Sequence, residues 1–207
     1  MLLKTKNLMK AFGGLKAINK VDFELPVGEI RGIIGPNGSG KSTFFNLVSG
    51  VYDPDPGSYI EFDGHDITNE PPHKIGALGL SRTFQLLRLY QDMSVINNVM
   101  SGYHTRVKYK FFDAVIGRKK IWDQEKEIKD EMMELLSFVG LADYAELNAS
   151  ELSGGQRRLL VLARAIAMKP KLLILDEPAA GLSPVNVDNL MKIIMQLKDK
   201  YGLTLII

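Results

Sequence analysis

A glycine-rich stretch between two apolar segments constrains the fold of this chain more than any other feature. Residues 35–42 read GPNGSGKS, after the apolar run 30–34 and before residues 43–49, whose apolar spacing is helical. Backbone amides can wrap an anion only where side chains do not intervene, and a following helix adds its N-terminal amides and dipole. The match to G-x-x-x-x-G-K-[ST] in this context predicts a phosphate-binding loop between a strand and a helix.

The residues of this loop have separate expected roles. Lys41 should reach the β- and γ-phosphates of ATP, and the hydroxyl of Ser42 should ligate Mg²⁺. The residues expected to bind the nucleotide here are Gly35, Pro36, Asn37, Gly38, Ser39, Gly40, Lys41, Ser42 and Thr43. The alternative is a strand–helix turn with an incidental lysine, but both the full motif and its flanks fit a nucleotide site. The loop alone does not select a reaction, since kinases, GTPases, motors and transport ATPases share it.

Composition narrows the classes of protein that remain. The chain has 207 residues, of which 45% are apolar and 24% charged, as in an ordinary globular domain. The net charge of +2 does not require a polyanionic partner, and the absence of cysteine excludes disulfides and thiolate metal sites. The N-terminal residues MLLKTKNLMK lack the apolar region of a signal peptide. No run approaches the ~18 apolar residues that span a bilayer, so we expect a cytoplasmic protein.

The pattern of apolar residues predicts an α/β fold with a largely parallel sheet, because strands alternate with helices in the last third of the chain. The predicted strands include residues 21–25, 60–62, 172–175 and 203–207, and the predicted helices include 43–49, 128–139, 157–168 and a helix that Ser183 and Pro184 begin. The final strand would bury a free carboxylate at Ile207, which is costly. We therefore expect the natural protein to continue and this chain to be truncated at its C-terminus.

A second candidate feature follows the predicted strand 172–175. Residues 171–178 read KLLILDEP, so Asp176 and Glu177 lie at the carboxyl end of that strand, where parallel sheets place their ligands. Asp176 is expected to hold Mg²⁺ through water, and Glu177 is expected to orient and polarise the attacking water. The alternative is an acidic strand end that faces solvent.

The stretch LSGGQ, residues 152–156, predicts a helix start with a second function. Ser153 can cap the helix, and Gln156 can complete a capping box. Gly154 and Gly155 leave the first amides of the helix bare, which makes a second anion site. We expect this site to bind the γ-phosphate of a nucleotide held by another copy of the domain.

GPNGSGKS, LSGGQ and LLILDE, in this order, resemble the nucleotide-binding subunits of ABC transporters over essentially the whole chain. The resemblance implies a P-loop NTPase fold of the ABC ATPase type in a single domain, residues 1–207. It implies a core plus an N-terminal antiparallel β subdomain in residues 1–84 and 157–207, and a helical subdomain in about 86–156. It also implies a head-to-tail dimer that holds two ATP molecules between P-loops and LSGGQ segments.

Further positions match the family one by one. Gln85, in SRTFQ, matches the glutamine that reaches Mg²⁺ and the attacking water, and Phe12 matches the aromatic residue that stacks on adenine. Residues 179–184, AAGLSP, match the loop that crosses to the partner subunit. The family's switch histidine would follow Ile207, and the histidines at 65, 73 and 104 lie in other elements. We therefore expect this chain to bind ATP better than it hydrolyses it.

Residues 63–85, with DIT, PPH-x-I and RTFQ, resemble the ATPases of branched-chain amino-acid uptake systems. That resemblance implies permease subunits in the membrane, an extracytoplasmic solute-binding protein and a second ATPase subunit, either identical or paralogous. It places the chain on the cytoplasmic face of the membrane. Many members carry an LSYGQ-like signature where this chain has LSGGQ, so urea or short amides remain alternative solutes.

Three other kinds of ATPase or kinase fit the sequence less well. A DNA-repair ATPase would carry long heptad arms, but none separates Lys41 from Ser153. A translation ATPase usually joins two cassettes, and a P-loop kinase would leave LSGGQ without a purpose. The basic and aromatic segment 104–122 is most simply a solvated helix face. Contact of this segment with anionic lipids is the alternative, and no nucleic-acid partner is expected, since the charge is nearly balanced.

Overall fold

The computed structural model describes residues 1–83, 89–103 and 118–207, without the side chains of 118–124. The chain forms two compact units. The first unit comprises Met1–Gln85, Pro170–Pro178 and Ile194–Ile207, and the second comprises Leu86–Lys169 and Ala179–Ile193. The sequence-based division at about 86–156 remains a prediction.

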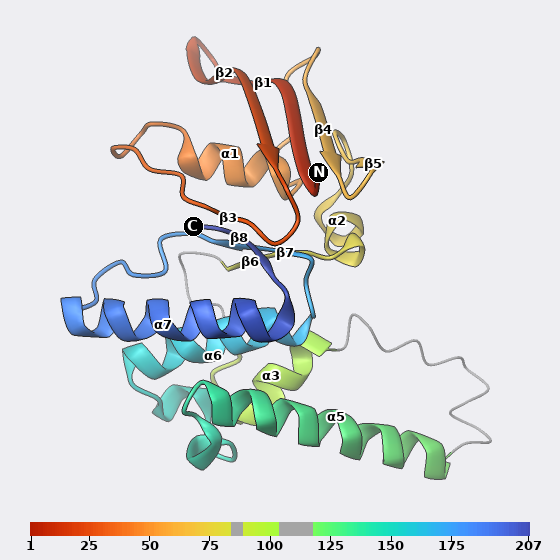
Figure 1. Cartoon of the computed structure of the whole chain (residues 1–207), viewed down its shortest axis with the longest axis vertical. Helices are drawn as coiled ribbons and strands as arrows, with labels where there is room; N and C mark the ends of the chain where they lie inside the picture. The colour runs from red at the N-terminus through yellow and green to blue at the C-terminus, as the bar shows by residue number, and fades with distance from the viewer. Residues whose placement is uncertain (84–88, 104–117) are drawn as a thin grey trace. The chain divides into compact units, whose positions relative to one another are not determined.

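The first unit contains an antiparallel sheet with the strand order β2-β1-β4-β5. Its strands are β1 (Leu3–Phe12), β2 (Leu15–Leu25), β4 (Tyr59–Phe62) and β5 (His65–Asp66) (Figure 1). Asp63 and Gly64 join β4 to β5 with φ angles of 49° and 77°, which suit a tight hairpin turn. The strands predicted within 21–25 and 60–62 are thus confirmed.

The second sheet of this unit is entirely parallel, with the order β3-β8-β7-β6. Its strands are β3 (Ile30–Arg31), β6 (Leu80–Thr83), β7 (Leu172–Leu175) and β8 (Thr204–Ile206). Every residue of β7 and β8 is buried, as expected for parallel strands covered on both faces. The predicted parallel sheet and the predicted strand at 172–175 are confirmed.

The strand before the glycine loop is shorter than its apolar run. Only Ile30 and Arg31 pair with β8, while Ile33 donates a single backbone hydrogen bond of 2.7 Å to Ile207. Ile34 is 98% exposed. The strand shortens because β3 lies at the edge of the sheet and the chain leaves the ladder to enter the glycine loop.

Helix α1 (Lys41–Val48) packs its apolar side into the core of the first unit. Phe44, Phe45, Leu47 and Val48 are buried there together with residues of both sheets, including Leu3, Phe62 and Ile174. Helix α2 (Pro72–Leu78) ends at Gly79, whose φ of +109° gives the left-handed cap that terminates many helices. This packing fixes the start of α1 beside the parallel sheet.

The second unit is helical. It contains α3 (Val95–Tyr103), α5 (Arg118–Phe138), the short 3₁₀ helices η2 (Ala142–Tyr144) and η3 (Ala149–Glu151), and α6 (Gly154–Ala167). Helix α7 (Pro184–Tyr201) belongs to this unit up to Ile193 and to the first unit from Ile194. The predicted helical face of α5 is confirmed, since its apolar residues are buried at Met132, Leu135 and Leu136.

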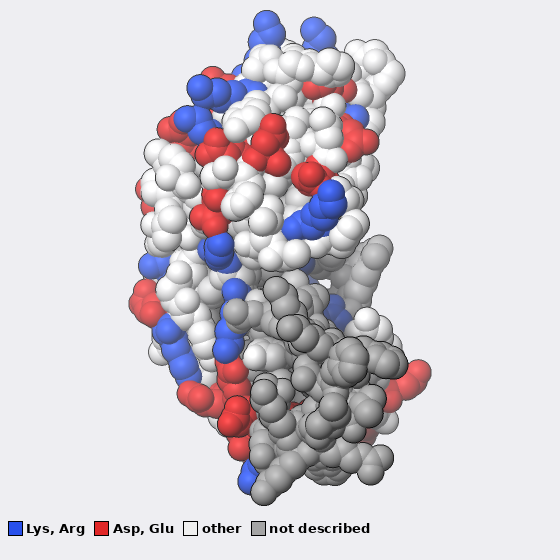
Figure 2. Space-filling view, turned by 90° about the vertical axis from the view of Figure 1, so that its right-hand side faces the viewer, with Lys and Arg blue, Asp and Glu red and all other residues white. Residues whose placement is uncertain are grey.

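The surface is of mixed charge. On the face seen in Figure 2, lysine and arginine side chains alternate with aspartate and glutamate. Among the described helices, none is both long enough and apolar enough to cross a membrane.

Candidate functional site

The N-terminus of α1 is open to an anion. Gly40 occupies the N-cap with φ +96° and provides no side-chain hydrogen bond to the amides of the first turn. A Cβ at this position would lie 2.6 Å from the carbonyl oxygen of Ala17, so both the backbone angle and the close approach require glycine. The uncapped amides and the helix dipole together favour a negatively charged group at this end.

The loop before α1 folds onto its own lysine. The Nζ of Lys41 donates hydrogen bonds to the carbonyl oxygens of Gly35 at 2.6 Å and Pro36 at 3.0 Å. A Cβ on Gly35 would lie 2.5 Å from the Oγ of Ser39, so the loop closes tightly. The ammonium group therefore lies within the loop. A bound anion could replace the two neutral carbonyl oxygens as the acceptor of its hydrogen bonds, and hydrogen bonds between charged groups are stronger.

A cavity of about 700 Å³ opens at this helix end, a size suited to a small ligand. It brings together most of the predicted nucleotide residues with Glu177. The lining residues are Phe12, Leu15, Lys16, Ala17, Asn37, Gly38, Ser39, Gly40, Lys41, Ser42, Thr43 and Glu177. The structure thus places in one cavity residues that are far apart in the sequence.

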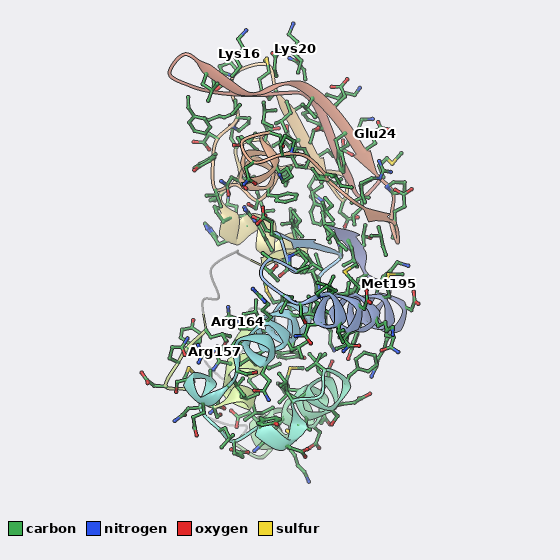
Figure 3. All side chains as sticks on the ribbon, turned by 90° about the vertical axis from the view of Figure 1, so that its left-hand side faces the viewer. Lys16, Lys20, Glu24, Arg157, Arg164 and Met195 are labelled. Carbon is green, nitrogen blue, oxygen red and sulfur yellow. The ribbon has the colours of Figure 1, made fainter. Side chains whose placement is uncertain are left out.

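Three of these residues come from β2 and were missed by the sequence analysis. Leu15, Lys16 and Ala17 follow the hairpin turn after Phe12, and Leu15 pairs directly with Phe12. Figure 3 shows Lys16 on this hairpin strand, from which it adds a positive charge to the lining. These residues could have been identified from the hairpin, because its first strand ends at Phe12, the predicted adenine-binding residue, and the residues just after the turn lie beside it.

Phe12 does not lie in the core. It is the last residue of β1, and its side chain is 44% exposed. Its ring meets Tyr52 edge to face, with the ring centroids 5.4 Å apart, and the Nζ of Lys10 lies 5.6 Å from its centroid. An exposed aromatic ring at the cavity is suited to stack on a planar ligand.

The two acidic residues after β7 have different environments. Asp176 is 8% exposed, and its Oδ2 accepts a hydrogen bond of 2.8 Å from Arg82. Glu177 is exposed and lines the cavity. Its φ of +49° is unusual for a residue with a side chain, and such conformations concentrate at functional sites. The acidic strand end therefore faces the ligand cavity through Glu177.

The oxygen donors near this cavity suit Mg²⁺. The described residues contain no group of three or more His, Cys, Asp or Glu side chains that could hold a metal. Mg²⁺ is usually bound by one or two carboxylates together with substrate phosphates and water, so a complete protein cage is not needed. Ser42, which lines the cavity, and Asp176, which precedes the lining residue Glu177, are a hydroxyl and a carboxylate that could serve this purpose.

The LSGGQ segment forms its predicted cap in the second unit. The Oγ of Ser153 accepts a hydrogen bond of 3.3 Å from the amide of Gln156, and the Oε1 of Gln156 accepts one of 2.8 Å from the amide of Ser153. Gly154 and Gly155 are exposed, and a Cβ on either would meet nothing within 4 Å. The predicted capping box is confirmed, and the two glycines leave open space above the helix start.

Helix α6 also holds the segment 179–184. Arg158 donates a hydrogen bond to the carbonyl oxygen of Ala180, and Gly181 turns the chain with φ +71°. Figure 3 shows Arg157 and Arg164 on the same helix. Burial lowers the pKa of the Arg164 guanidinium from its ordinary value, and this group lies 5.8 Å from the ring centroid of Tyr90.

Some predicted features lie outside the described residues. These are Gln85, His104 and the side chains of the basic and aromatic segment 104–122. No sequence motif assigned a role to Arg82, which donates a hydrogen bond to Asp176. The sequence signal that could have identified Arg82 was its place as the basic first residue of RTFQ, within the short strand β6.

Comparison with known proteins agrees with these features. The profile of the family described as ABC transporter matches residues 18–180. The probable branched-chain amino acid transport ATP-binding protein LivG of Archaeoglobus fulgidus is 43% identical over 210 residues, which cover 100% of this chain and 78% of that protein. The high-affinity branched-chain amino acid transport ATP-binding protein LivG of Escherichia coli K12 is 37% identical over 206 residues, which cover 100% of this chain and 80% of that protein.

A solved structure is similar over nearly the whole chain. It is the ADP conformation of MJ1267, an ATP-binding cassette of an ABC transporter, with a TM-score of 0.83 and 34% identity. The match covers 99% of this chain and 79% of that one.

Proposed function

The chain belongs to the ABC transporter family, and from this premise we propose that it is the ATP-binding and hydrolysing subunit of an importer for branched-chain amino acids. The names of its relatives from Archaeoglobus fulgidus and Escherichia coli support this solute over urea or short amides. The cavity at the start of α1 carries the proposal. It combines uncapped amides, the Lys41 ammonium, an exposed aromatic ring and a carboxylate.

ATP would bind with its phosphates at the start of α1. The loop residues Gly35–Thr43 would wrap the β- and γ-phosphates, and Lys41 would exchange its contacts with Gly35 and Pro36 for phosphate oxygens. Adenine would stack on Phe12, which is exposed at the same cavity. ADP in the similar MJ1267 cassette supports an adenine nucleotide as the ligand.

Hydrolysis would use the two carboxylates after β7. Glu177 would orient a water molecule for attack on the γ-phosphorus and accept its proton as the bond to the bridging oxygen breaks. Mg²⁺, when bound, would neutralise phosphate charge, held by Ser42 and Asp176 with Gln85 as a further ligand from outside the described residues. Glu177 suits this role because it is exposed at the cavity, whereas Asp176 is buried beside Arg82.

A second copy of the domain would complete the site. Ser153, Gly154, Gly155 and Gln156 would contact the γ-phosphate of ATP bound to the partner, in a head-to-tail dimer. The capping box uses only part of the first-turn amides of α6, and the open space at the two glycines allows close approach. The partner could be an identical chain or a paralogue.

The movement of this dimer would drive transport. We propose that the subunit binds permease subunits on the cytoplasmic face of the membrane, and that an extracytoplasmic protein delivers the solute to them. Closure on ATP and opening after hydrolysis would transmit force to the permeases. No solute would contact this chain, so specificity would come from its partners.

A binding experiment tests the nucleotide site. A fluorescent ATP analogue is titrated into the wild-type chain and into Lys41→Ala. Hydrogen bonds to charged groups contribute about 1.5–3 kcal/mol, so the affinity should fall on the order of 10- to 100-fold. Lys192→Ala, an exposed change on α7, is the control and should bind as the wild type does. Equal binding by the wild type and Lys41→Ala would refute the site.

A transport experiment tests the solute. The chain is combined in vesicles with candidate permease subunits and a candidate solute-binding protein, and uptake of labelled leucine and labelled urea is measured. Leucine uptake that requires ATP and stops in Glu177→Gln supports the proposal. ATP-dependent uptake of urea alone would replace branched-chain amino acids as the solute.

A further inference from the structure

A buried arginine connects three elements of the first unit. Arg82 on β6 donates from Nη2 to the Oδ2 of Asp176 at 2.8 Å. Its Nη1 donates to the Oδ1 of Asn46 at 2.6 Å and to the Oγ of Ser49 at 3.3 Å. Asn46 lies in helix α1, and Ser49 is the C-cap of that helix. The guanidinium carbon lies 5.6 Å from the ring centroid of Phe45. One side chain thus joins strand β6, the end of β7 and α1.

The register of the parallel sheet creates this arrangement. Arg82 on β6 is the partner of Ile174 on β7, and Asp176 follows Ile174 by two residues. Side chains two residues apart along a strand point to the same face of the sheet. Asp176, one residue beyond the end of β7, therefore projects to the same side as Ile174 and its partner Arg82. Helix α1 covers that side, since Phe45 contacts the arginine. Asn46 is four residues after Ser42 and therefore lies on the same side of the helix as that hydroxyl.

The ion pair between Arg82 and Asp176 is almost completely buried. The side chains of Arg82 and Asp176 are 6% and 8% exposed. Arginine presents a rigid fork of donors, which can bind a carboxylate and a second acceptor at once, whereas lysine acts as a point charge. Among the described residues, no other side chain donates to Asp176, so Arg82 determines the orientation of this carboxylate.

We propose that Arg82 is a positioning residue for metal binding, which holds the Asp176 carboxylate in one orientation relative to the helix that carries Ser42. This inference rests on the proposed function, because it assigns Asp176 and Ser42 to Mg²⁺. Groups that orient a metal ligand change metal affinity without contacting the metal. Arg82 also lies three residues before Gln85 in the sequence.

The test compares Arg82→Lys, Arg82→Gln and Asn46→Ala in the full chain. Mn²⁺ replaces Mg²⁺ as the probe, and its binding to the protein with ATP is followed by electron paramagnetic resonance. Changes in groups that orient metal ligands typically weaken metal binding about 10- to 100-fold, and we expect about tenfold for Arg82→Lys. We expect a smaller loss for Asn46→Ala. Binding of the fluorescent ATP analogue in EDTA should match the wild type in all three variants.

Lys171→Gln is the matched control. It also removes a cation that donates a hydrogen bond to a carboxylate in the first unit, but its partner is Asp63 in the β4–β5 turn. Mn²⁺ affinity should not change in this variant. Thermal unfolding of each variant identifies any that does not fold. If Arg82→Gln fails to fold, Arg82→Lys and Asn46→Ala still decide the outcome.

A second measurement needs no nucleotide or metal. Hydrogen exchange of the free chain is followed in peptides that cover residues 41–49 and 172–178. If Arg82 fixes the strand end against the helix, both peptides should exchange faster in Arg82→Lys than in the wild type. Faster exchange together with weaker Mn²⁺ binding supports the proposal. Folded Arg82→Lys with wild-type Mn²⁺ affinity would overturn it.

The two proposals can fail separately. If the wild-type chain binds no ATP, the proposed function fails, while the exchange measurement still decides whether Arg82 positions Asp176. If the wild type binds ATP and Mn²⁺ but exchange in Arg82→Lys is unchanged at both peptides, the positioning role fails alone.

Discussion

The ring of Phe12 meets the ring of Tyr52 edge to face, at a centroid distance of 5.4 Å and an interplanar angle of 73°. Tyr52 therefore supports the exposed ring from one side and leaves the cavity side open to a ligand. The contact gives an aromatic residue at the end of a strand a packing partner although it is 44% exposed. It also separates the roles of the two rings, because only Phe12 lines the cavity.

We predict that Phe12→Ala weakens ATP binding without weakening the binding of inorganic triphosphate. Stacking of a base on an aromatic side chain contributes about 1–3 kcal/mol, which corresponds to a loss of roughly 5- to 150-fold for ATP. Competition titrations of both ligands against the fluorescent analogue measure the two effects. Tyr52→Phe keeps the edge contact and should behave as the wild type. An equal loss for ATP and triphosphate would show that Phe12 does not contact adenine.

The glycine loop allows a prediction from two neighbouring glycines. Both Gly38 and Gly40 have positive φ angles, at +81° and +96°. A Cβ on Gly38 would meet nothing within 4 Å, whereas one on Gly40 would lie 2.6 Å from the carbonyl oxygen of Ala17. Gly38→Ala should therefore cost only the left-handed strain of about 1–2 kcal/mol. Gly40→Ala should lower stability and ATP affinity further, because it adds a clash with backbone.

Thermal unfolding and ATP titration of the two alanine variants test this difference. The wild type should be the most stable protein, Gly38→Ala should be less stable, and Gly40→Ala should be the least stable. If Gly40→Ala is as stable as Gly38→Ala and binds ATP equally well, the close approach of Ala17 to the start of α1 is wrong.

The second unit offers a packing test between α3 and α6. A Cβ on Gly102 would clash with the carbonyl oxygen of Arg164, so the two helices meet at this glycine. Gly102→Ala should destabilise the protein by about 1–3 kcal/mol, the usual cost of forcing atoms into a packed site. Gly76→Ala in α2 is the matched control, since its Cβ would meet nothing within 4 Å. That change should stabilise its helix by about 0.5–1 kcal/mol.

Chemical denaturation of both variants measures these changes in the free energy of unfolding. Opposite signs are expected for the two substitutions. A stabilising effect of Gly102→Ala would contradict the close contact of α3 with α6.

Local patterns carried most of what the sequence predicted. Three of the predicted features each depend on residues within a few positions of one another. They are the strand Leu172–Leu175, the cap formed by Ser153 and Gln156, and the start of α1. A short pattern can encode such features because propensity, capping and turn chemistry act locally. The sequence alone could therefore single out the glycine loop around Lys41, which we propose binds the phosphates.

Features that depend on strand register could not be predicted in this way. Arg82 meets Asp176 only because β6 and β7 pair in parallel with Arg82 opposite Ile174. Lys16 enters the cavity lining only because the β1–β2 hairpin brings β2 beside the loop. The exposure of Ile34 likewise depends on where β3 leaves the sheet, although its apolar run favoured a longer strand. A single sequence does not specify these long-range alignments.

An ion pair between the β4–β5 turn and the start of β7 provides a prediction for pH dependence. Lys171 donates a hydrogen bond to Asp63, and this contact lowers the pKa of the Asp63 carboxyl below its ordinary value of 3.8. A carboxyl with a lowered pKa in the folded state contributes stability above its unfolded pKa, and the contribution is lost as the pH falls through the folded pKa. The stabilising effect of the pair should thus be complete at neutral pH and disappear in strong acid.

Lys171→Gln tests this pair. At pH 7 the variant should be less stable than the wild type by about 0.2–1 kcal/mol, because both side chains are partly exposed and solvent screens their attraction. The difference should persist down to about the ordinary pKa of aspartate and shrink at lower pH. Denaturation curves from pH 7 into the acid range measure it, with Lys192→Gln on the exposed surface as the control. A stability difference that grows as the pH falls would contradict the assigned direction, because protonation of Asp63 can only weaken its bond to a cation.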